Sequence, residues 1–471
     1  MALLGRRLAV GVGLPAQPAG AADVGRVTPP GVRGSGPRVA LVTVGSRGDV
    51  EPFVALARGL QRRGADVSLA APRTFAAMAQ RYRVAFDPLP VDPADLLTAE
   101  LGRRWIESGR DPRAFLRGLR DLADPLGEDL ADAMIAACAD ADVIVYATLA
   151  FPAWHIADAR GLPAVQVSFA PLCPTAAFPP LLFPDPFAGR DPWRATPTAA
   201  AARAYHRAAH VLFAQLLWLP LRRRVNRWRR TRLDAPPHGV RSPGLEVIRR
   251  GEPLLHAFSP TILPPPRDWG PHVVTTGAWF LDGTDEWTPP PAVGDFMSAG
   301  PPPVVVGLGS MTARDPEALT ALVVAALRRA RQRGLILAGW ADLGRPPVTQ
   351  LPDGIMASDE LPHAWILPRA GAIVHHGGSG TTAAGLRAGL PSVVVPHFGD
   401  QYLWADRVHA LGAGPPPIPR ADLTVDRLAA AIRLTVDDIA VHRSAAAVGA
   451  RIRAERGVAR GVATVIDHAG R

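Results

Sequence analysis

The sequence contains no lysine, so every basic side chain among its 52 Lys and Arg residues is an arginine. A P-loop needs a lysine before Ser or Thr to reach the nucleotide phosphates, and its absence excludes that class of site. Cysteine is also scarce, with only Cys138 and Cys173 in 471 residues. Two cysteines without metal-ligand spacing exclude a disulfide framework and indicate a reducing compartment, so we predict a cytoplasmic location.

Long apolar runs and metal-ligand patterns are missing as well. No apolar run reaches the roughly 20 residues that a membrane-spanning helix needs, and no His or Cys spacing indicates a zinc site. The formal charge of +10 suits an anionic ligand, a membrane surface or nucleic acid. Because no nucleic-acid recognition motif accompanies the charge, we expect no nucleic-acid partner.

The first residues imitate a signal peptide, with Arg6 and Arg7 before a short apolar run. That run is weak and interrupted by proline, which is not typical of a secretion signal. We therefore interpret residues 1–37 as a disordered leader.

Two stretches of alternating strands and helices make up most of the chain. The first opens with the apolar run RVALVTV at Arg38, followed by a predicted helix over Pro52–Arg63. The second opens with PVVVGLGS and a helix that has Asp315 as its N-cap. Such alternation predicts an α/β protein with two Rossmann-like, doubly wound domains that face each other across a cleft. The predicted units are a disordered leader (1–37), an N-terminal acceptor-binding domain (38–278), an interdomain linker without regular structure (279–303), a C-terminal nucleotide-sugar-binding domain (304–440) and a C-terminal helix that packs back across the domains (441–471).

A glycine-rich turn joins a strand to a helix in the sequence AIVHHGGSGTT, which ends at Thr382. The free backbone N–H groups and the positive end of the helix dipole face the carboxyl edge of the strand, which is a phosphate site in outline. Gly377, Gly378 and Gly380 do not have the spacing of a G-x-G-x-x-G dinucleotide fingerprint. A tight turn that only caps the helix is the alternative.

Two further loops should reach the same edge of this sheet. HFGDQ, which ends with Asp400 and Gln401, follows the next strand, and its acid and amide suit the vicinal hydroxyls of a sugar. Gly309-Ser310-Met311 ends the first strand of the same domain. Three loops that converge on one edge favour a ligand site over helix capping.

These motifs resemble the nucleotide-sugar-dependent glycosyltransferases of family 1, which have the GT-B fold, and most of all their sterol-type and antibiotic members. The resemblance rests on GSRGDVEPFVALA, PVVVGLGSM and the run from VHHGGSGTT through DQYLWADR, and it covers the chain from Arg38 onward. It implies binding of the donor sugar by Asp400 and Gln401. It implies binding of the donor diphosphate by His376, Gly378, Gly380, Thr381 and Ser310.

The resemblance also implies a general base, because a hydroxyl acceptor must lose its proton as it attacks the anomeric carbon. Plant members place a histidine after the first strand, whereas this sequence has Asp49 there, like the sterol and antibiotic enzymes. Asp49 as a helix N-cap is the alternative. We predict a single inverting displacement in which the helix dipole and His376 stabilise the leaving diphosphate in place of a metal. The D-x-D triplet Asp140–Asp142 precedes a strand, so we interpret it as a turn.

An arginine-rich segment, Arg222–Arg232, ends a long predicted helix. Its arginines together with Trp218 and Trp228 would suit a lipid interface, which predicts peripheral contact with the inner face of the membrane. The alternative is a solvated helix whose arginines pair with nearby acids.

The sequence therefore predicts an inverting hexosyltransferase that uses no metal or other cofactor. Its partners would be a UDP- or dTDP-sugar donor and a hydroxylated, hydrophobic small molecule such as a sterol or a macrolide. A nucleotide-sugar epimerase of the same fold and a non-catalytic nucleotide-sugar-binding protein are the alternatives. The presence of both Asp49 and His376 argues against the non-catalytic protein.

Overall fold

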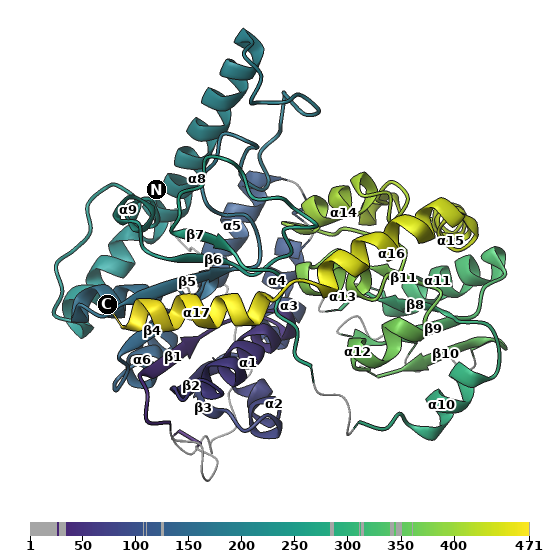
Figure 1. Cartoon of the computed structure of the whole chain (residues 1–471), viewed down its shortest axis with the longest axis horizontal. Helices are drawn as coiled ribbons and strands as arrows, with labels where there is room; N and C mark the ends of the chain where they lie inside the picture. The colour runs from purple at the N-terminus through teal and green to yellow at the C-terminus, as the bar shows by residue number, and fades with distance from the viewer. Residues whose placement is uncertain are drawn as a thin grey trace, which may run out of the picture.

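The computed structural model of the chain shows two parallel β-sheets side by side, each covered by helices (Figure 1). It describes residues 26–470 except 28–33, 107, 110, 124–126, 283–286, 310, 312–314, 340–342, 345–350 and 360.

The first sheet has seven parallel strands among the described residues, in the order β3-β2-β1-β4-β5-β6-β7. Within this sheet Leu41 of the interior strand β1 pairs with Leu69 on one side and Val145 on the other, and all three side chains are fully buried. Helices on both faces bury such strands, which explains why they are continuous apolar runs in the sequence. The strands are β1 (Arg38–Val42), β2 (Asp66–Pro72), β3 (Ala85–Leu89), β4 (Val143–Ala147), β5 (Ala164–Ser168), β6 (Leu254–His256) and β7 (Val273–Thr275).

The second sheet has five parallel strands in the described part of the chain, in the order β10-β9-β8-β11-β12. Val306 of the central strand lies between Ile336 and Val374, again with all three side chains buried. The predicted α/β class with two doubly wound parallel sheets is confirmed. The strands are β8 (Val304–Gly307), β9 (Gly334–Leu337), β10 (Ile355–Ser358), β11 (Ala372–His375) and β12 (Ser392–Val394).

Most helices connect successive strands and cover the faces of the two sheets. The helices of the first part of the chain are α1 (Arg47–Gln61), α2 (Ala76–Arg81), α3 (Pro93–Thr98), α4 (Glu100–Ile106), α5 (Pro112–Ala123), α6 (Gly127–Ala137), α7 (Pro152–Arg160), α8 (Pro197–Arg232) and α9 (Pro243–Arg250). Those of the second part are α10 (Pro291–Ser298), α11 (Pro316–Ala330), α12 (His363–Ile366), α13 (Ser379–Arg387), α14 (Gln401–Ala410), α15 (Val425–Asp437), α16 (Ile439–Arg453) and α17 (Gly457–Ala469).

Two predicted boundaries are wrong, one at a proline inside a helix and one at a proline in a first turn. Helix α1 begins at Arg47 rather than Pro52, with Ser46 as its N-cap. The proposed linker contains a regular element, since α10 has a proline in its first turn and buries Val293 against the second sheet.

Part of the predicted leader is ordered rather than disordered. Val27 forms an isolated antiparallel bridge with Phe86 of β3, and the guanidinium of Arg26 pairs with the Asp87 carboxylate at 2.9 Å. Residues 1–25 and 28–33 of that predicted segment lie outside the described residues.

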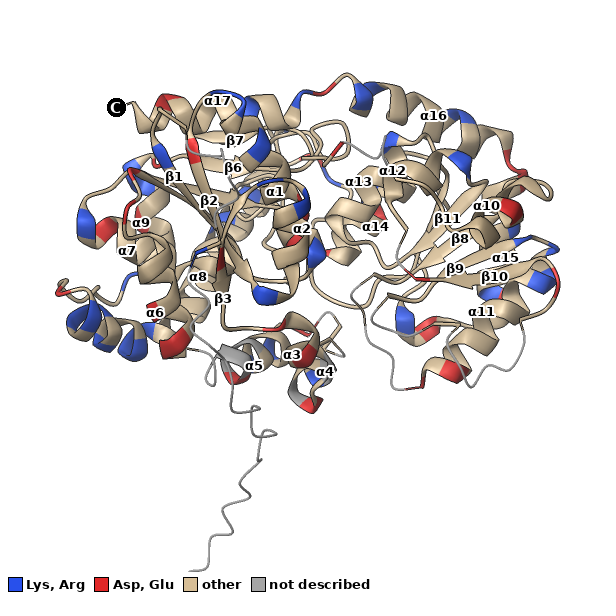
Figure 2. Cartoon of the chain, turned by 90° about the horizontal axis from the view of Figure 1, so that it is seen from below, with Lys and Arg blue, Asp and Glu red and all other residues tan. Residues whose placement is uncertain are grey.

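The predicted C-terminal helix is two helices, α16 and α17, which lie end to end along one side of both sheets (Figures 1 and 2). Helix α16 packs on α13 of the second sheet, and α17 packs on α1 of the first. The α1–α17 contact is close, because a Cβ added at Gly59 would lie 2.7 Å from a Val462 methyl carbon.

The chain passes between the two sheets twice at the same place, before α10 and between α16 and α17. Glu455 ties this point to the first domain, because its Oε1 accepts a hydrogen bond from the Ser259 hydroxyl at 2.7 Å. Gly457 lies directly against the other crossing, so that an added Cβ would be 2.4 Å from the Ala278 carbonyl oxygen. A residue with a Cβ atom cannot occupy position 457 unless the main chain shifts, so this close contact requires glycine.

Replacing that glycine should therefore destabilise the protein. We expect Gly457→Ala to lower the free energy of unfolding by more than about 2 kcal/mol, because the clash is with backbone atoms. Gly239→Ala is the matched control, since an added Cβ there has open space. Denaturant unfolding of the three proteins measures the difference, and equal stability of both variants would show that the crossing tolerates the methyl group.

Candidate active site

Asp49 lies just after β1, in the first turn of α1, at the edge of the first sheet that faces the second domain. Its carboxylate Oδ2 accepts hydrogen bonds from the Ser46 backbone N–H at 2.8 Å and from the Ser46 hydroxyl at 3.2 Å. Gly45 leaves the room for this arrangement, because an added Cβ would lie 2.3 Å from Oδ2 and the φ of Gly45 is +137°. Asp49 as the N-cap is therefore wrong, because Ser46 is the N-cap and Asp49 is the third helical residue, which completes a capping box with Ser46. The role of Asp49 as a general base stays a prediction.

Burial raises the pKa of Asp49 to about 6 from its ordinary 3.8, against the two hydrogen bonds from Ser46, and the charge of Asp400 raises it further. A carboxylate with this pKa is ionised at neutral pH and is a stronger base than an exposed aspartate. The effect of the Asp400 charge on Asp49 indicates that these two residues, from different domains, lie near each other.

His376 follows β11 and is buried between two glycine residues. A Cβ added at Gly378 would lie 2.4 Å from the imidazole Nε2, and one added at Gly309 would lie 2.7 Å from Cε1. Burial lowers the pKa of His376 well below its ordinary value, and the neighbouring His375 and His397 lower it further. The ring is therefore neutral at pH 7, and within the described part of the chain its Nδ1 has no hydrogen-bond partner.

The glycine-rich turn holds the start of α13 open to the domain boundary. Gly377 has φ +91°, and an added Cβ would lie 2.9 Å from the Gln401 carbonyl oxygen, so this turn requires glycine. The first intrahelical bond runs from Thr382 N–H to the Gly378 carbonyl. The N–H groups of the three preceding residues, which include Gly380 and Thr381, therefore have no partner within the helix.

Asp400 is the N-cap residue of α14 and follows β12. Its Oδ2 accepts a hydrogen bond from the Trp404 indole Nε1 at 2.8 Å. Burial raises the pKa of Asp400 above its ordinary value, which the Trp404 hydrogen bond opposes. Trp404 in turn packs on Phe258 of the first domain, with ring centroids 5.4 Å apart, so the position of Asp400 depends on contact between the domains.

Gln401 lies beside Asp400, but its side chain is engaged within the protein. Its Oε1 accepts hydrogen bonds from the backbone N–H groups of His397 at 2.8 Å and Phe398 at 3.3 Å. Its Nε2 donates to the sulfur of Met311 at 3.2 Å. The amide therefore shapes the loop that carries Asp400, and one N–H of Nε2 is left for a ligand.

The structure thus brings most of the predicted site residues to one boundary. Those of the second domain are His376, Gly378, Gly380, Thr381, Asp400 and Gln401, and Asp49 faces them from the first. Ser310 lies outside the described residues.

A small apolar core stabilises this boundary. Phe258, Ile262 and Leu263 of the first domain are buried in one cluster with residues of α13, α14 and α16. The Arg407 guanidinium of α14 also donates to the Ile262 carbonyl oxygen at 2.8 Å. These contacts fix the position of the two domains, and so of the strand ends of the two sheets, relative to each other.

The D-x-D triplet lies at the opposite edge of the first sheet. Asp142 precedes β4 and forms an ion pair with Arg38, at the start of β1, at 2.7 Å. No group of three or more His, Cys, Asp or Glu side chains with metal-site geometry occurs among the described residues.

The interpretation of α8 as a tryptophan-anchored membrane helix is wrong in its residues. Trp218 and Trp228 are each only 6% exposed, so neither ring can enter a lipid interface. Arg229 is also buried and pairs with Asp158 at 2.9 Å, and Arg232 pairs with Asp132 at 3.0 Å. The alternative reading, in which arginines pair with acids, describes these two residues.

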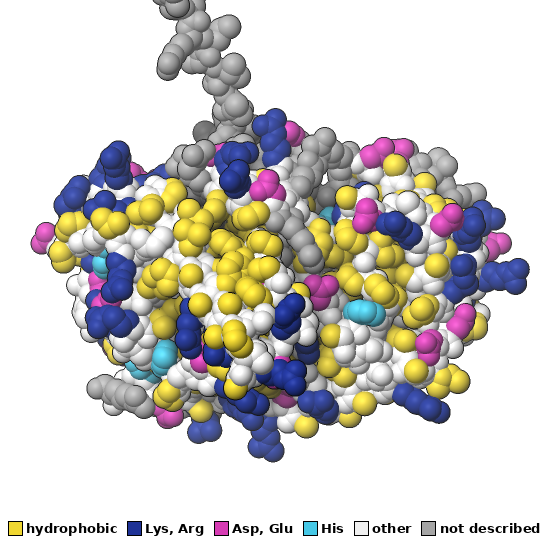
Figure 3. Space-filling view, turned by 90° about the horizontal axis from the view of Figure 1, so that it is seen from above, with side chains coloured by type: hydrophobic (Ala, Val, Ile, Leu, Met, Phe, Trp, Pro, Cys, Tyr) yellow, Lys and Arg dark blue, Asp and Glu magenta, His cyan; other side chains and the backbone are white. Residues whose placement is uncertain are grey.

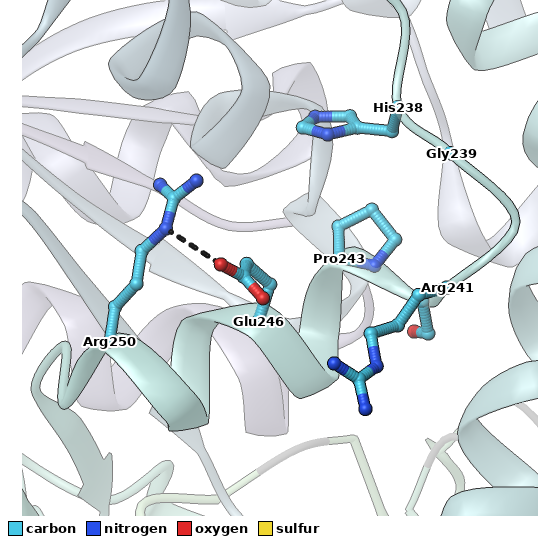
Figure 4. A pocket seen from close by; sticks show the side chains of 7 residues that line it. His238, Gly239, Arg241, Pro243, Glu246 and Arg250 are labelled. Atoms are coloured by element: carbon cyan, nitrogen blue, oxygen red, sulfur yellow. Dashed lines mark hydrogen bonds and ion pairs between the residues drawn. The ribbon is translucent and has the colours of Figure 1, made fainter.

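A separate cavity of about 250 Å³ lies between α9 and the loop before it (Figure 4). Glu246 and Arg250 on its wall form an ion pair at 3.4 Å. The cavity contains none of the predicted site residues. It is lined by His238, Gly239, Arg241, Ser242, Pro243, Glu246 and Arg250.

Two family models match this chain, one in each domain. Residues 39–179 match the glycosyltransferase family 28 N-terminal domain, and residues 334–464 match the C-terminal domain of erythromycin biosynthesis protein CIII-like proteins. The chain is 33% identical over 447 residues to a sterol 3-beta-glucosyltransferase of Arabidopsis thaliana, covering 92% of this chain and 65% of the relative. In both of its domains the chain is therefore similar to GT-B glycosyltransferases.

Further comparisons agree with this family. A sterol 3-beta-glucosyltransferase of Emericella nidulans is 33% identical over 438 residues, which cover 91% of this chain and 30% of that protein. The chain thus spans less than two thirds of the length of these two relatives. The kitacinnamycin glycosyltransferase structure aligns with a TM-score of 0.65 at 21% identity, over 92% of this chain and 99% of the other. The glycosyltransferase VinC, solved with dTDP, aligns with a TM-score of 0.62 at 19% identity, over 92% and 99%. These structures confirm the predicted GT-B fold.

Sequence reasoning missed the residues that hold this candidate active site in place. The S-x-x-D spacing of Ser46 and Asp49 is that of a capping box and could have revealed their contact. Trp404 lies four residues after Asp400, one helical turn away, which is also a readable signal. Nothing local in the sequence indicates that Phe258 supports Trp404 from the other domain.

The neutral, unpaired imidazole leads to a binding prediction. If His376 donates a hydrogen bond to a diphosphate, His376→Ala should weaken the affinity for UDP or dTDP by about tenfold to a hundredfold, since hydrogen bonds to charged groups contribute about 1.5–3 kcal/mol. Calorimetric titration measures this loss. His409→Ala, a change at an exposed histidine of α14, should bind as the unmodified protein does, and unchanged affinity in His376→Ala would remove this histidine from the site.

Proposed function

We propose that the chain transfers a sugar from a nucleoside diphosphate sugar to a hydroxyl group of a hydrophobic acceptor, with inversion at the anomeric carbon. The observation that carries this proposal is the meeting of Asp49 with Asp400 and the α13 start at the domain boundary. A base on one side of the reacting carbon and an anion site on the other is the arrangement that a direct displacement requires.

The donor side supports binding of a diphosphate without charged protein groups. The N–H groups at the start of α13 and its dipole favour an anion, and an added Cβ at Gly380 meets no atom within 4 Å. The unpaired Nδ1 of His376 can supply a further hydrogen bond if it carries the ring proton. Asp400 and the remaining N–H of Gln401 would then contact the hydroxyls of the sugar.

In the proposed reaction Asp49 accepts the proton of the acceptor hydroxyl as its oxygen bonds to the anomeric carbon. The bond from that carbon to the diphosphate oxygen breaks, and its electron pair leaves with the diphosphate. The developing negative charge meets the α13 N–H groups and the neutral His376, which stabilise it most in a site shielded from water. The raised pKa of Asp49 makes the proton transfer more favourable than it would be for an exposed aspartate.

The relatives support the class of both substrates. Two are named sterol 3-beta-glucosyltransferases, which favours a hexose donor and a hydrophobic acceptor alcohol. VinC was solved with dTDP, which favours dTDP as the nucleotide and leaves UDP as the other candidate named from the sequence. We therefore propose a UDP- or dTDP-hexose as donor and a sterol, macrolide or similar molecule as acceptor.

The pKa of Asp49 predicts the acidic limb of the pH profile. Only the ionised carboxylate accepts a proton, so kcat/KM should fall as the pH drops through about 6. Because Asp400 is close, the midpoint belongs to the pair rather than to one residue. Steady-state rates between about pH 4 and pH 9 measure this limb, and a flat profile down to the ordinary aspartate pKa would contradict the role of Asp49.

Removing the carboxylate should abolish activity without weakening the fold. The raised folded-state pKa means that stability from protonated Asp49 is present below pH 3.8 and is lost as the pH rises through about 6. At pH 8 the buried charge therefore costs up to roughly 3 kcal/mol, and Asp49→Asn avoids this cost. We expect this variant to lose at least about a hundredfold in transfer rate and to be no less stable than the unmodified protein at pH 8.

The control for this experiment is Asp142→Asn, which changes an exposed carboxylate at the far edge of the same sheet. It should retain full activity. Equal turnover by Asp49→Asn and the unmodified protein would exclude Asp49 as the base. If the unmodified protein transfers no sugar from UDP- or dTDP-hexoses to sterols or macrolides, a non-catalytic binding protein is favoured.

A further inference from the structure

Helix α8 carries apolar side chains that face solvent. Leu212, Leu216 and Leu219 are 51%, 37% and 47% exposed, and the adjacent Val211 is 49% exposed. Single exposed leucines are ordinary on protein surfaces, but contiguous apolar surface indicates an interaction site.

The exposed leucines continue into exposed arginines on the same face of the helix. Positions 212, 216, 219, 223, 227 and 230 are spaced by three or four residues, so their side chains share one side of α8. Arg223, Arg227 and Arg230 are exposed, and no ion pair among the described residues involves them. We call these six residues, Leu212, Leu216, Leu219, Arg223, Arg227 and Arg230, the α8 stripe.

The charge of α8 is of one sign. The helix has 36 residues and contains no Asp or Glu. Three of its arginines, Arg207, Arg229 and Arg232, form ion pairs with carboxylates outside α8, and none of the three belongs to the stripe. The stripe therefore presents apolar side chains and unneutralised guanidinium groups next to each other. This combination suits a surface with an anionic outer layer and an apolar layer beneath it.

The position of α8 leaves the stripe accessible to a large flat surface. Figure 1 shows α8 projecting from the body of the first domain. Figure 3 looks down on that end of the molecule and shows hydrophobic side chains gathered there, with arginine side chains around them. A bilayer surface can meet such a projecting helix along its length.

We propose that the α8 stripe lies on the surface of a bilayer that contains anionic lipids. Leu212, Leu216 and Leu219 would enter the boundary between headgroups and acyl chains, and the three arginines would contact lipid phosphates. The contact is peripheral, since none of the helices in the described parts of the chain combines the length and apolar character needed to span a bilayer. The exposed leucines would thus insert into the lipid in place of Trp218 and Trp228, which are buried. The proposal does not depend on the proposed transferase reaction.

Vesicle sedimentation with the full chain tests the proposal. The unmodified protein should sediment with vesicles of phosphatidylcholine and phosphatidylglycerol, and less with phosphatidylcholine alone. The triple variant Leu212→Gln/Leu216→Gln/Leu219→Gln should bind the mixed vesicles at least about tenfold more weakly. Arg223→Gln/Arg227→Gln/Arg230→Gln should remove the preference for the anionic lipid and the sensitivity of binding to salt.

The matched control is Leu434→Gln/Ile439→Gln, which removes apolar side chains that are 44% and 65% exposed outside α8. It should bind vesicles as the unmodified protein does. All of the changed side chains are exposed, so thermal unfolding should be unaffected and loss of binding can be assigned to the surface. The inference is wrong if the unmodified protein ignores both vesicles, or if the leucine variant binds equally well. It is also wrong if the leucine variant instead converts a dimer into a monomer, because the stripe would then cover a second copy of the chain.

Discussion

The candidate site depends on two half-buried carboxyl groups, Asp49 and Asp400, that lie near each other where the domains meet. Removal from water raises the pKa of both, and each is held by one defined partner, Ser46 or Trp404. Because like charges in a water-poor site oppose each other, the arrangement persists only with support from its surroundings. That support comes from the apolar cluster around Phe258 and from the adjacent chain crossings at Gly457.

The titratable groups at the boundary are shifted in opposite directions by the same physical cause. Burial raises the pKa of the carboxyls and lowers that of His376, so the carboxyls become stronger bases while the imidazole is kept neutral. In the proposed reaction this assigns proton transfer to the first domain and leaves the second to stabilise the diphosphate through N–H groups and the helix dipole. The neutral donor side would then bind its anion mainly by geometry, which fits the glycine residues packed around His376.

Much of the fold and of the site could be predicted from the sequence, because parallel strands bring their carboxyl ends to one edge. The apolar runs around Leu41 and Val306 predicted the sheets, and the loops after β11 and β12 follow neighbouring parallel strands as expected. Features set by tertiary contact could not be predicted. The local sequence pattern did not reveal that Trp218 and Trp228 are buried or that α10 forms in a proline-rich stretch. It also did not reveal that the side-chain amide oxygen of Gln401 accepts hydrogen bonds from its own loop. The pKa of Asp49 likewise depends on burial by residues far away in the sequence.

In the proposed reaction, the start of α13 and His376 bind the anionic leaving group opposite Asp49. An experimental structure with bound UDP or dTDP tests it most directly. We expect the phosphates to lie within hydrogen-bond distance of the Gly380 and Thr381 N–H groups and of the His376 ring, with the terminal phosphate toward Asp49. A nucleotide bound with its phosphates away from α13 would contradict it.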